Sequence, residues 1–209
     1  MALRILRPFI KSHAHPRGLL GRLAAWHMLH ENREANRWML ELLAISPTDH
    51  VLEVGFGPGD AIRKAAALAP HGLIVGVDAS DTMLALARRR NRRAIAAGLV
   101  DVRLGDAAAL PFDAESFDKA FGVNLVYFLP DPAACARELW RVLRAGGTVG
   151  LYVVGSEYLA RWSSLIAGIY TLLDEERLAS VLRAAGFGSV RIEARAFAWG
   201  RGVCALKTK

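Results

Sequence analysis

The chain has 209 residues, of which 53% are hydrophobic and 22% charged, and its formal net charge is +7. This balance excludes a disordered or fibrous chain, and the length favours one domain, residues 1–209, with a large core. No apolar run approaches the roughly 18 residues that a membrane-spanning helix needs, and Cys135 and Cys204 are too few for a disulfide framework. We therefore expect a cytoplasmic globular protein.

Most of the excess positive charge lies in a basic arm, residues 1–22. No acidic residue precedes Glu31, and the arm contains Arg4, Arg7, Lys11, Arg17 and Arg22. These charges interrupt the apolar N-terminus before the hydrophobic region of a signal peptide can form. A peripheral membrane contact through this arm is one hypothesis, and a solvated basic surface is the other. The arginine run at 88–93 either attracts phosphates, acidic lipids or acidic substrates, or forms a solvated basic face.

Residues 17–45 have a helical pattern with an approximate apolar stripe that includes Leu19, Leu23, Trp26 and Leu40. We interpret residues 1–46 as an N-terminal helical cap, and residues 47–209 as the core of the same domain. The sequence contains neither an internal repeat nor a low-complexity linker between the two parts.

After Pro47 strand-like and helix-like patterns alternate, which is typical of a parallel sheet covered by helices. The predicted strands are 51–54, 73–77, 100–104, 117–122, 147–154, 189–195 and 202–207. The predicted helices are 59–69, 81–97, 131–144 and 174–185. Asp81 and Asp131 are expected to begin helices, and Gly146 and Gly147 to end one. Gly200 and Gly202 suggest a hairpin between the last two strands.

The most informative segment is the glycine-rich turn that follows the first predicted strand. It contains Glu53, Gly55, Gly57 and Gly59, spaced two residues apart, followed by Asp60. Glycines at such a turn let the backbone approach a ligand closely. The dinucleotide pattern G-x-G-x-x-G would need a glycine in place of Asp60, and the Lys-Ser or Lys-Thr of a P-loop is absent. The segment therefore disfavours a nicotinamide dehydrogenase and a P-loop protein.

Four further motifs follow in order along the chain. They are Asp78-x-Ser80-x-x-Met83, Leu104-Gly105-Asp106-Ala107, Leu110-Pro111-Phe112 ahead of Ser116-Phe117-Asp118, and Glu138-x-x-Arg141 leading to Gly146-Gly147. With the glycine-rich turn, this ordered set resembles the class I S-adenosylmethionine-dependent methyltransferases, in particular the small-molecule group of ubiquinone and menaquinone methyltransferases. The resemblance covers about residues 50–207.

The resemblance implies a Rossmann-like α/β fold: a seven-stranded, mostly parallel sheet with helices on both faces, an antiparallel last strand and the N-terminal helical cap. It also implies S-adenosyl-L-methionine as cofactor. Asp78 would accept hydrogen bonds from the ribose hydroxyls, Met83 would pack on the adenine, and Asp106 would accept from the adenine amino group. The full set of implied cofactor residues is Glu53, Gly55, Phe56, Gly57, Gly59, Asp78, Ala79, Met83, Asp106, Ala107 and Asn124. Alternatively the glycines serve only the turn, Met83 is a core residue and Asp106 caps a turn.

The acceptor pocket is expected above the carboxyl ends of the strands, where open α/β sheets bind ligands. Its candidate wall residues are Trp26, Trp38, Tyr127, Phe128, Tyr158 and Trp162, which would suit an apolar or aromatic acceptor. Structural burial is an equally open interpretation of the tryptophans. Asn32, Asn36 and Arg37 are candidates for holding the methionine carboxylate of the cofactor, with solvent exposure as the alternative.

His27, His30 and Tyr127 are candidates for a general base, and a histidine on a helix surface is the alternative interpretation of the first two. We expect no metal site, because no acid or cysteine joins the histidines in a ligand pattern. No nucleic-acid-binding module is recognisable. The stretch Asn124-Leu125-Val126-Tyr127 lacks the two prolines of enzymes that methylate amide or exocyclic amine nitrogens. Neither cysteine follows a proline, as the nucleophile of cytosine-carbon enzymes does.

The sequence thus predicts a methyltransferase that acts on a small, apolar or aromatic acceptor by in-line displacement. One alternative is a lipid or quinol methyltransferase acting at a membrane surface. Another is a protein that binds S-adenosylmethionine without catalysis. The acceptor and its reacting atom, the oligomeric state, and a lid at 156–170 stay open at this level.

Overall fold

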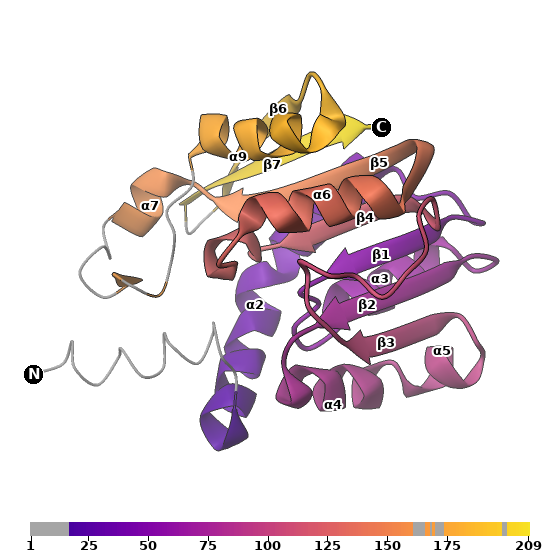
Figure 1. Ribbon diagram of the computed structural model, residues 1–209. Coiled ribbons are helices and arrows are strands. Elements are labelled where there is room, and N and C mark those ends of the chain that lie inside the picture. Colours follow the sequence, from indigo (N-terminus) through magenta and orange to yellow (C-terminus); the bar gives the residue numbers. More distant parts are fainter. Residues whose placement is uncertain (1–16, 161–165, 168, 170–173, 198–199) are drawn as a thin grey trace, which may run out of the picture.

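A computed structural model describes residues 17–160, 166–167, 169, 174–197 and 200–209. Sixteen elements follow one another along these residues (Figure 1). They are α2 (Gly18–Leu43), β1 (His50–Val54), α3 (Asp60–Leu68), β2 (Leu73–Asp78), α4 (Asp81–Arg90), α5 (Arg92–Ala96), β3 (Val100–Leu104), β4 (Phe117–Val123), the 3-10 turn η1 (Val126–Phe128), α6 (Pro132–Val142), β5 (Leu143–Val154), α7 (Ser156–Ala160), α9 (Glu175–Leu182), the π turn η2 (Arg183–Phe187), β6 (Arg191–Phe197) and β7 (Gly200–Thr208).

The strands form one seven-stranded sheet in the order β3-β2-β1-β4-β5-β7-β6. Neighbours from β3 to β5 are parallel, whereas β7 is antiparallel to both β5 and β6. The expected Rossmann-like sheet with an antiparallel last strand is confirmed. From β1 the chain continues to β2 and β3 on one side of the sheet, and β4 then lies on the other side of β1. The strand order therefore reverses beside β1. A ligand site is expected at the carboxyl ends of the strands at this point.

The sheet separates two hydrophobic cores. On one face α6, α9 and η2 pack over the strands through residues such as Leu139, Leu178 and Phe187. On the other face α2, α3 and α4 pack through residues such as Met39 and Ile62. Figure 1 shows α6 and α9 in front of the sheet and α3 behind it. Each core contains one buried free cysteine, Cys135 on the α6 face and Cys204 on the α2 face.

Most element boundaries agree with the sequence pattern, because buried strands are short apolar runs and the helices begin at capping residues. Asp131 caps α6 by accepting a hydrogen bond from the Ala134 amide at 3.0 Å. Ser80, rather than Asp81, caps α4, with its hydroxyl accepting from the Met83 amide at 3.3 Å.

Three local predictions differ from the structure in detail. The helix predicted over 81–97 is divided at Asn91 into α4 and α5; Asn91 has φ of −100° and ψ of 12°, and its side chain donates to the same Ala87 carbonyl as its backbone N–H. Gly146 and Gly147 do not end a helix; they lie inside β5, where its register against β4 shifts. The predicted hairpin between the last two strands is present, since β6 pairs antiparallel with β7, but Gly200 and Gly202 belong to β7 instead of the turn.

Candidate active site

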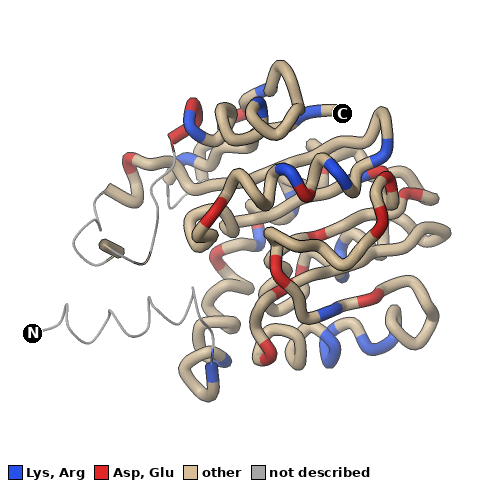
Figure 2. The backbone as a smooth tube through the Cα atoms, viewed as in Figure 1, with Lys and Arg blue, Asp and Glu red and all other residues tan. Residues whose placement is uncertain are grey.

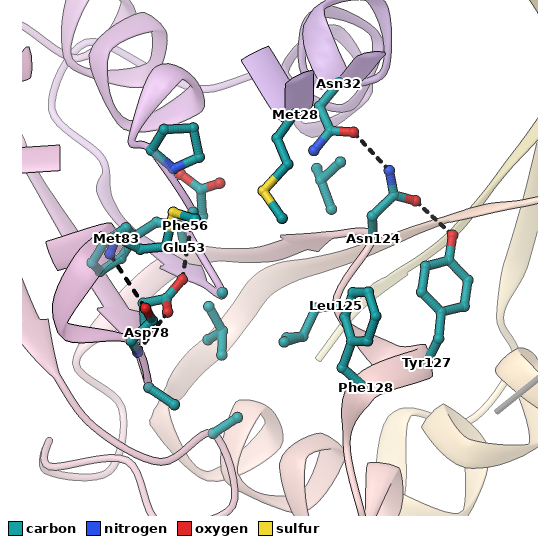
Figure 3. A pocket seen from close by; sticks show the side chains of 18 of the residues that line it. Met28, Asn32, Glu53, Phe56, Asp78, Met83, Asn124, Leu125, Tyr127 and Phe128 are labelled. Atoms are coloured by element: carbon teal, nitrogen blue, oxygen red, sulfur yellow. Dashed lines mark hydrogen bonds between the residues drawn. The ribbon is translucent and has the colours of Figure 1, made fainter. Parts of the chain in front are cut away.

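A cavity of about 590 Å³ opens at the carboxyl ends of β1, β2 and β4. The loops after these strands form its floor, and α2 forms the opposite wall (Figure 3). The cavity lies at the position where the strand order reverses. Its size is ordinary for a small-molecule site, which typically measures about 300–1,000 Å³.

The glycine-rich turn has three left-handed residues, Gly55, Gly57 and Gly59, with φ of 71°, 51° and 76°. A Cβ atom on Gly55 would lie 2.7 Å from Leu125 Cδ1, and one on Gly59 would lie 2.8 Å from Ala87 Cβ. A Cβ on Gly57 would meet only Met28 Sδ, at 3.9 Å, within the cavity wall. Gly55 and Gly59 are therefore required by the protein's own packing, whereas Gly57 leaves space for a ligand.

Two side chains of the arginine-rich segment fix this turn from behind. The Arg90 guanidinium donates to the Pro58 carbonyl at 3.0 Å, and the buried Asn91 amide donates to the Gly59 carbonyl at 3.0 Å. Figure 2 shows basic residues gathered along α4 and α5. Arg90 is thus a structural residue of the site, which neither interpretation of the arginine run had foreseen.

Asp78 ends β2 and lies on the cavity wall beside the turn. One carboxylate oxygen accepts from the Gly57 amide at 2.8 Å and the other from the Ser80 amide at 2.9 Å. Burial raises the pKa of Asp78 to about 6, although these two hydrogen bonds favour the ionised form. Each carboxylate oxygen can still accept a further hydrogen bond, so the geometry suits a ligand with two neighbouring hydroxyl groups.

Glu53 is buried in β1 and also lines the cavity. Its Oε2 has no hydrogen-bond partner in the described part of the chain. Burial raises the pKa of Glu53 well above its usual range, and the neighbouring Asp78 and Asp60 carboxylates raise it further. A buried unsatisfied oxygen costs free energy, so a ligand that donates a hydrogen bond to Oε2 would be stabilised here.

The other implied cofactor residues lie around the same cavity with one exception. Phe56, Ala79, Met83, Asp106, Ala107 and Asn124 all line it, whereas Gly59 does not. Met83 is buried, and Asp106 accepts a hydrogen bond from the Ala108 amide at 2.9 Å. Both therefore have a structural contact in addition to their place on the wall, as the alternative interpretations of these residues suggested.

The acceptor wall predicted from the sequence is corrected in part. Tyr127, Phe128 and Tyr158 line the cavity, but Trp26 and Trp38 do not. Trp26 is 60% exposed on the outer side of α2, and Trp38 packs against Tyr152 and Phe197 in the core. Trp162 lies outside the described residues.

The three candidate bases differ in their position relative to the cavity and in their contacts. His27 lines the cavity, and its Nδ1 lies 3.1 Å from Oε2 of Glu31, which lines it as well. His30 faces away from the cavity, and its Nδ1 contacts the Trp26 carbonyl at 3.1 Å. The Tyr127 hydroxyl accepts from the Val154 amide and donates to Asn124 Oδ1, both at 2.5 Å, so it already takes part in two hydrogen bonds.

The cap residues Asn32 and Asn36 line the cavity, whereas Arg37 is exposed and lies outside it. Sequence reasoning missed Met28, Leu125 and Leu129, which line it too. The spacing of Met28 one turn before Asn32 on α2 was the available signal, since residues four apart share a helix face. Leu125 carried no signal, because its contact with Gly55 depends on the pairing of β1 with β4.

Among the described residues, no three His, Cys, Asp or Glu side chains come together as potential metal ligands. None of the helices in the described ranges is long and apolar enough to cross a membrane.

Residues 52–151 match the family model described as a methyltransferase domain. The demethylmenaquinone methyltransferase of Roseiflexus sp. strain RS-1 is 33% identical over 187 residues, which is 76% of this chain and 76% of that protein. The enzyme of the same name from Symbiobacterium thermophilum is 37% identical over 118 residues, or 53% of this chain and 46% of the relative. The match thus spans about half the length of this second relative.

Solved structures of other proteins have a similar fold. The structure of the methyltransferase in complex with the Trm112 methyltransferase activator from Haloferax volcanii superposes with a TM-score of 0.77, at 20% identity, and 96% of each chain is covered. At that identity the likeness establishes the fold alone. It extends over nearly all of the chain, beyond the range of the family model.

The cavity fits S-adenosylmethionine in three respects: Gly57 leaves room at the turn, Asp78 can accept from a ribose, and Glu53 has an unsatisfied acceptor. These features, the four ordered motifs, the family match and the Roseiflexus relative agree with one another. The chain belongs to the class I S-adenosylmethionine-dependent methyltransferases, in the group of the ubiquinone and menaquinone methyltransferases.

Proposed function

We propose that the protein methylates a small molecule with an apolar or aromatic ring of the quinol type. The observation that carries this proposal is the division of the cavity into two halves. Five of its six carboxylates lie on or just after β1, β2 and β3, namely Glu53, Asp60, Asp78, Asp81 and Asp106, and the sixth, Glu31, lies on α2. The half beyond β4 and β5 is lined by apolar or aromatic side chains: Phe128, Leu129, Val154, Tyr158, Leu159 and Ile166.

The polar half suits the adenosyl part of the cofactor, and the apolar half is left for the acceptor. Bound S-adenosylmethionine supplies an activated methyl group, so the chain's own residues chiefly orient the acceptor and exclude water. The names of the relatives given above include demethylmenaquinone, which supports a quinol among the possible acceptors.

A protic acceptor also loses a proton when it is methylated. His27 and Glu31 contact each other and both line the cavity, so this pair is our candidate for taking up that proton. Tyr127 is less suited, because its hydroxyl already donates to Asn124.

An acceptor panel tests the proposal. Purified protein is incubated with S-adenosylmethionine and, separately, with hydroquinones, catechols, short-chain amines and carboxylates. Formation of S-adenosylhomocysteine is measured. We expect turnover with the hydroquinone or catechol members and none with the amines or carboxylates. Turnover confined to the amines would contradict the acceptor class, whereas tight cofactor binding with no turnover at all would favour a non-catalytic binding protein.

Action at a membrane surface is a second candidate, favoured by one feature of α2. Leu19, Leu20, Leu23 and Trp26 are exposed on its N-terminal half, by 52% to 83%, and Arg17 and Arg22 lie among them. An apolar row flanked by basic residues is typical of a helix that lies on anionic lipid. Arg17, His27 and Met28 of the same segment line the cavity, so such a contact would place its mouth near the lipid.

Vesicle co-sedimentation tests this second candidate. We expect binding to vesicles containing anionic lipid, weaker binding to neutral vesicles, and loss of binding in a Leu19→Ser, Leu23→Ser double variant. Leu68, which is 44% exposed on α3, provides the matched control Leu68→Ser. Equal sedimentation of the double variant and the native protein would exclude this role for α2.

A further inference from the structure

Three hydrogen bonds in series connect β5 to the cap helix α2 across the cavity wall, and Figure 3 shows the two that join Tyr127, Asn124 and Asn32. The Val154 amide donates to the Tyr127 hydroxyl at 2.5 Å, and this hydroxyl donates to Asn124 Oδ1 at 2.5 Å. The Asn124 amide nitrogen then donates to Asn32 Oδ1 at 2.9 Å. The series therefore has four members, and all four line the cavity.

The direction of the series is fixed at its β5 end. A backbone N–H can only donate, so the Tyr127 hydroxyl must accept from Val154 and use its own hydrogen elsewhere. That hydrogen goes to Asn124, whose Oδ1 lies 2.5 Å from the hydroxyl oxygen and can only accept. Oδ1 of Asn124 therefore faces Tyr127, and its amide nitrogen faces Asn32.

This direction decides which group Asn32 presents to the cavity. Because Asn124 donates to it, Asn32 must use its oxygen for that bond, and its amide nitrogen is turned elsewhere. Figure 3 shows this nitrogen on the side of Asn32 nearer Met28, away from Asn124. The side chain lies on the cavity wall, so two N–H donors face the ligand space.

We propose that Tyr127 and Asn124 are positioning residues that hold Asn32 as a hydrogen-bond donor to an oxygen atom of the bound ligand. The chemistry recognised is an anionic or carbonyl oxygen. Two sources offer one: the carboxylate of the cofactor's methionine part, and a ring oxygen of a quinol-type acceptor. The second source rests on the proposed function above, whereas the first rests only on the cofactor.

Two variants test the direction of the series and not merely its presence. Asn32→Asp keeps an oxygen for Asn124 to donate to but presents a second carboxylate oxygen to the cavity. Asn124→Asp keeps the acceptor for Tyr127 but offers Asn32 an oxygen, so the Asn32 amide turns to donate to it and presents Oδ1 to the cavity. Aspartate also tolerates the left-handed backbone of Asn124, with φ of 54°, better than most residues do.

Binding is measured by calorimetry with three probes. The first two are S-adenosylhomocysteine and its decarboxylated analogue, which differ only in the carboxylate. The third is 1,4-naphthoquinone, added to protein saturated with S-adenosylhomocysteine. Arg33→Gln, at an exposed residue next to Asn32, changes the net charge by the same amount as the two variants and is the control. Ligand-free thermal unfolding shows that each variant is folded.

If the carboxylate is the source, both variants bind S-adenosylhomocysteine at least about tenfold more weakly, as expected for loss of a charge-assisted hydrogen bond, and bind the decarboxylated analogue as the native protein does. If the acceptor is the source, only 1,4-naphthoquinone binding weakens. Native affinity of Asn32→Asp for all three probes overturns the proposal, and native affinity of Asn124→Asp alone overturns the role of the series. Failure of the native protein to bind naphthoquinone counts against the acceptor class and leaves the carboxylate result decisive for Asn32.

Discussion

The raised pKa of Asp78 predicts that cofactor binding depends on pH between about 5 and 7. Ligand hydroxyls that donate to Asp78 bind its ionised form, and the pKa in the free protein is about 6. About one tenth of the carboxyl groups are ionised one pH unit below the pKa, and about nine tenths one unit above it. Because affinity scales with the binding-competent fraction, binding should be roughly tenfold weaker at about pH 5 than at about pH 7.

Protonation of Asp78 does not itself unfold the protein. Its folded-state pKa lies above that of an unfolded aspartate, so its contribution to the free energy of unfolding increases as the pH falls from about 6 towards about 4. The weaker binding at low pH is therefore a property of the site. Proton linkage adds an independent measurement, because binding of the ionised form near pH 6 releases about half a proton per cofactor.

Calorimetry with S-adenosylhomocysteine at several pH values, in two buffers of different ionisation enthalpy, measures both quantities. Asp78→Asn is the control, since it cannot titrate; it should bind weakly at every pH and with no pH dependence from this position. Glu53, Glu31 and His27 also line the cavity, so the comparison with this variant assigns the effect. An affinity that is constant between about pH 5 and 7, or the same pH dependence in Asp78→Asn, would refute the reasoning.

Three further predictions concern the same wall. Gly57→Val should remove the shift in thermal midpoint that S-adenosylmethionine causes, while the free protein stays folded, because the valine side chain enters the ligand space. Gly59→Ala should instead destabilise the free protein, since its Cβ would lie 2.8 Å from Ala87 Cβ. A Gly57→Val protein with the native ligand shift would contradict this. Asp78→Ala should weaken cofactor binding far more than Asp113→Ala, because hydrogen bonds to a charged group contribute about 1.5–3 kcal/mol each; equal dissociation constants would remove the ribose role from Asp78. When unfolding is measured at a pH above neutral, Glu53→Gln should have a higher thermal midpoint than the native protein without ligand. At such a pH the buried carboxylate, with its raised pKa, destabilises the fold. A midpoint that is unchanged or lower would show that this carboxylate is stabilised in a way that its burial does not indicate.

The sheet and the glycine-rich turn were predictable because both depend on local sequence. The strand predicted over 51–54 lies within β1, where all four of these residues are buried, and the motifs after β1 and β2 line the cavity. A buried parallel strand is a short apolar run whatever its neighbours are. The turn likewise needs left-handed backbone at Gly55, Gly57 and Gly59, which is a property of those residues alone.

The acceptor side was predicted poorly because it depends on how α2 is rotated against the sheet. Trp26 and Trp38 are twelve residues apart on one helix, yet one is exposed and the other is in the core. Nothing in the apolar stripe of residues 17–45 distinguishes the side that packs on β5 from the side that faces the cavity. That rotation determines that Met28 and Asn32 line the cavity, and the pairing of β1 with β4 determines that Leu125 does.

The start of β5 shows the same limit on a smaller scale. The glycine pair at 146–147 has the local sequence of a helix end, but Phe117 already pairs with Leu143, and Lys119 with Thr148. The strand therefore begins before the glycines and takes them up in an irregular stretch. Such a register shift depends on the partner strand, which a local pattern does not contain.

Because each core contains one cysteine, thiol labelling can measure the opening of the two faces of the sheet separately. Both thiols are buried, and burial raises the pKa of Cys135 to about 12 and that of Cys204 above its ordinary value as well. Since the thiolate is the reactive form, neither residue reacts with an alkylating reagent while its core stays closed. The rate of labelling at Cys135 therefore reports opening of the layer beneath α6 and α9, and that at Cys204 reports opening of the layer beneath α2. A ligand that bridges α2 to the strand ends would slow labelling at Cys204 more than at Cys135. The two native cysteines therefore show which of the two cores a bound ligand stabilises against opening.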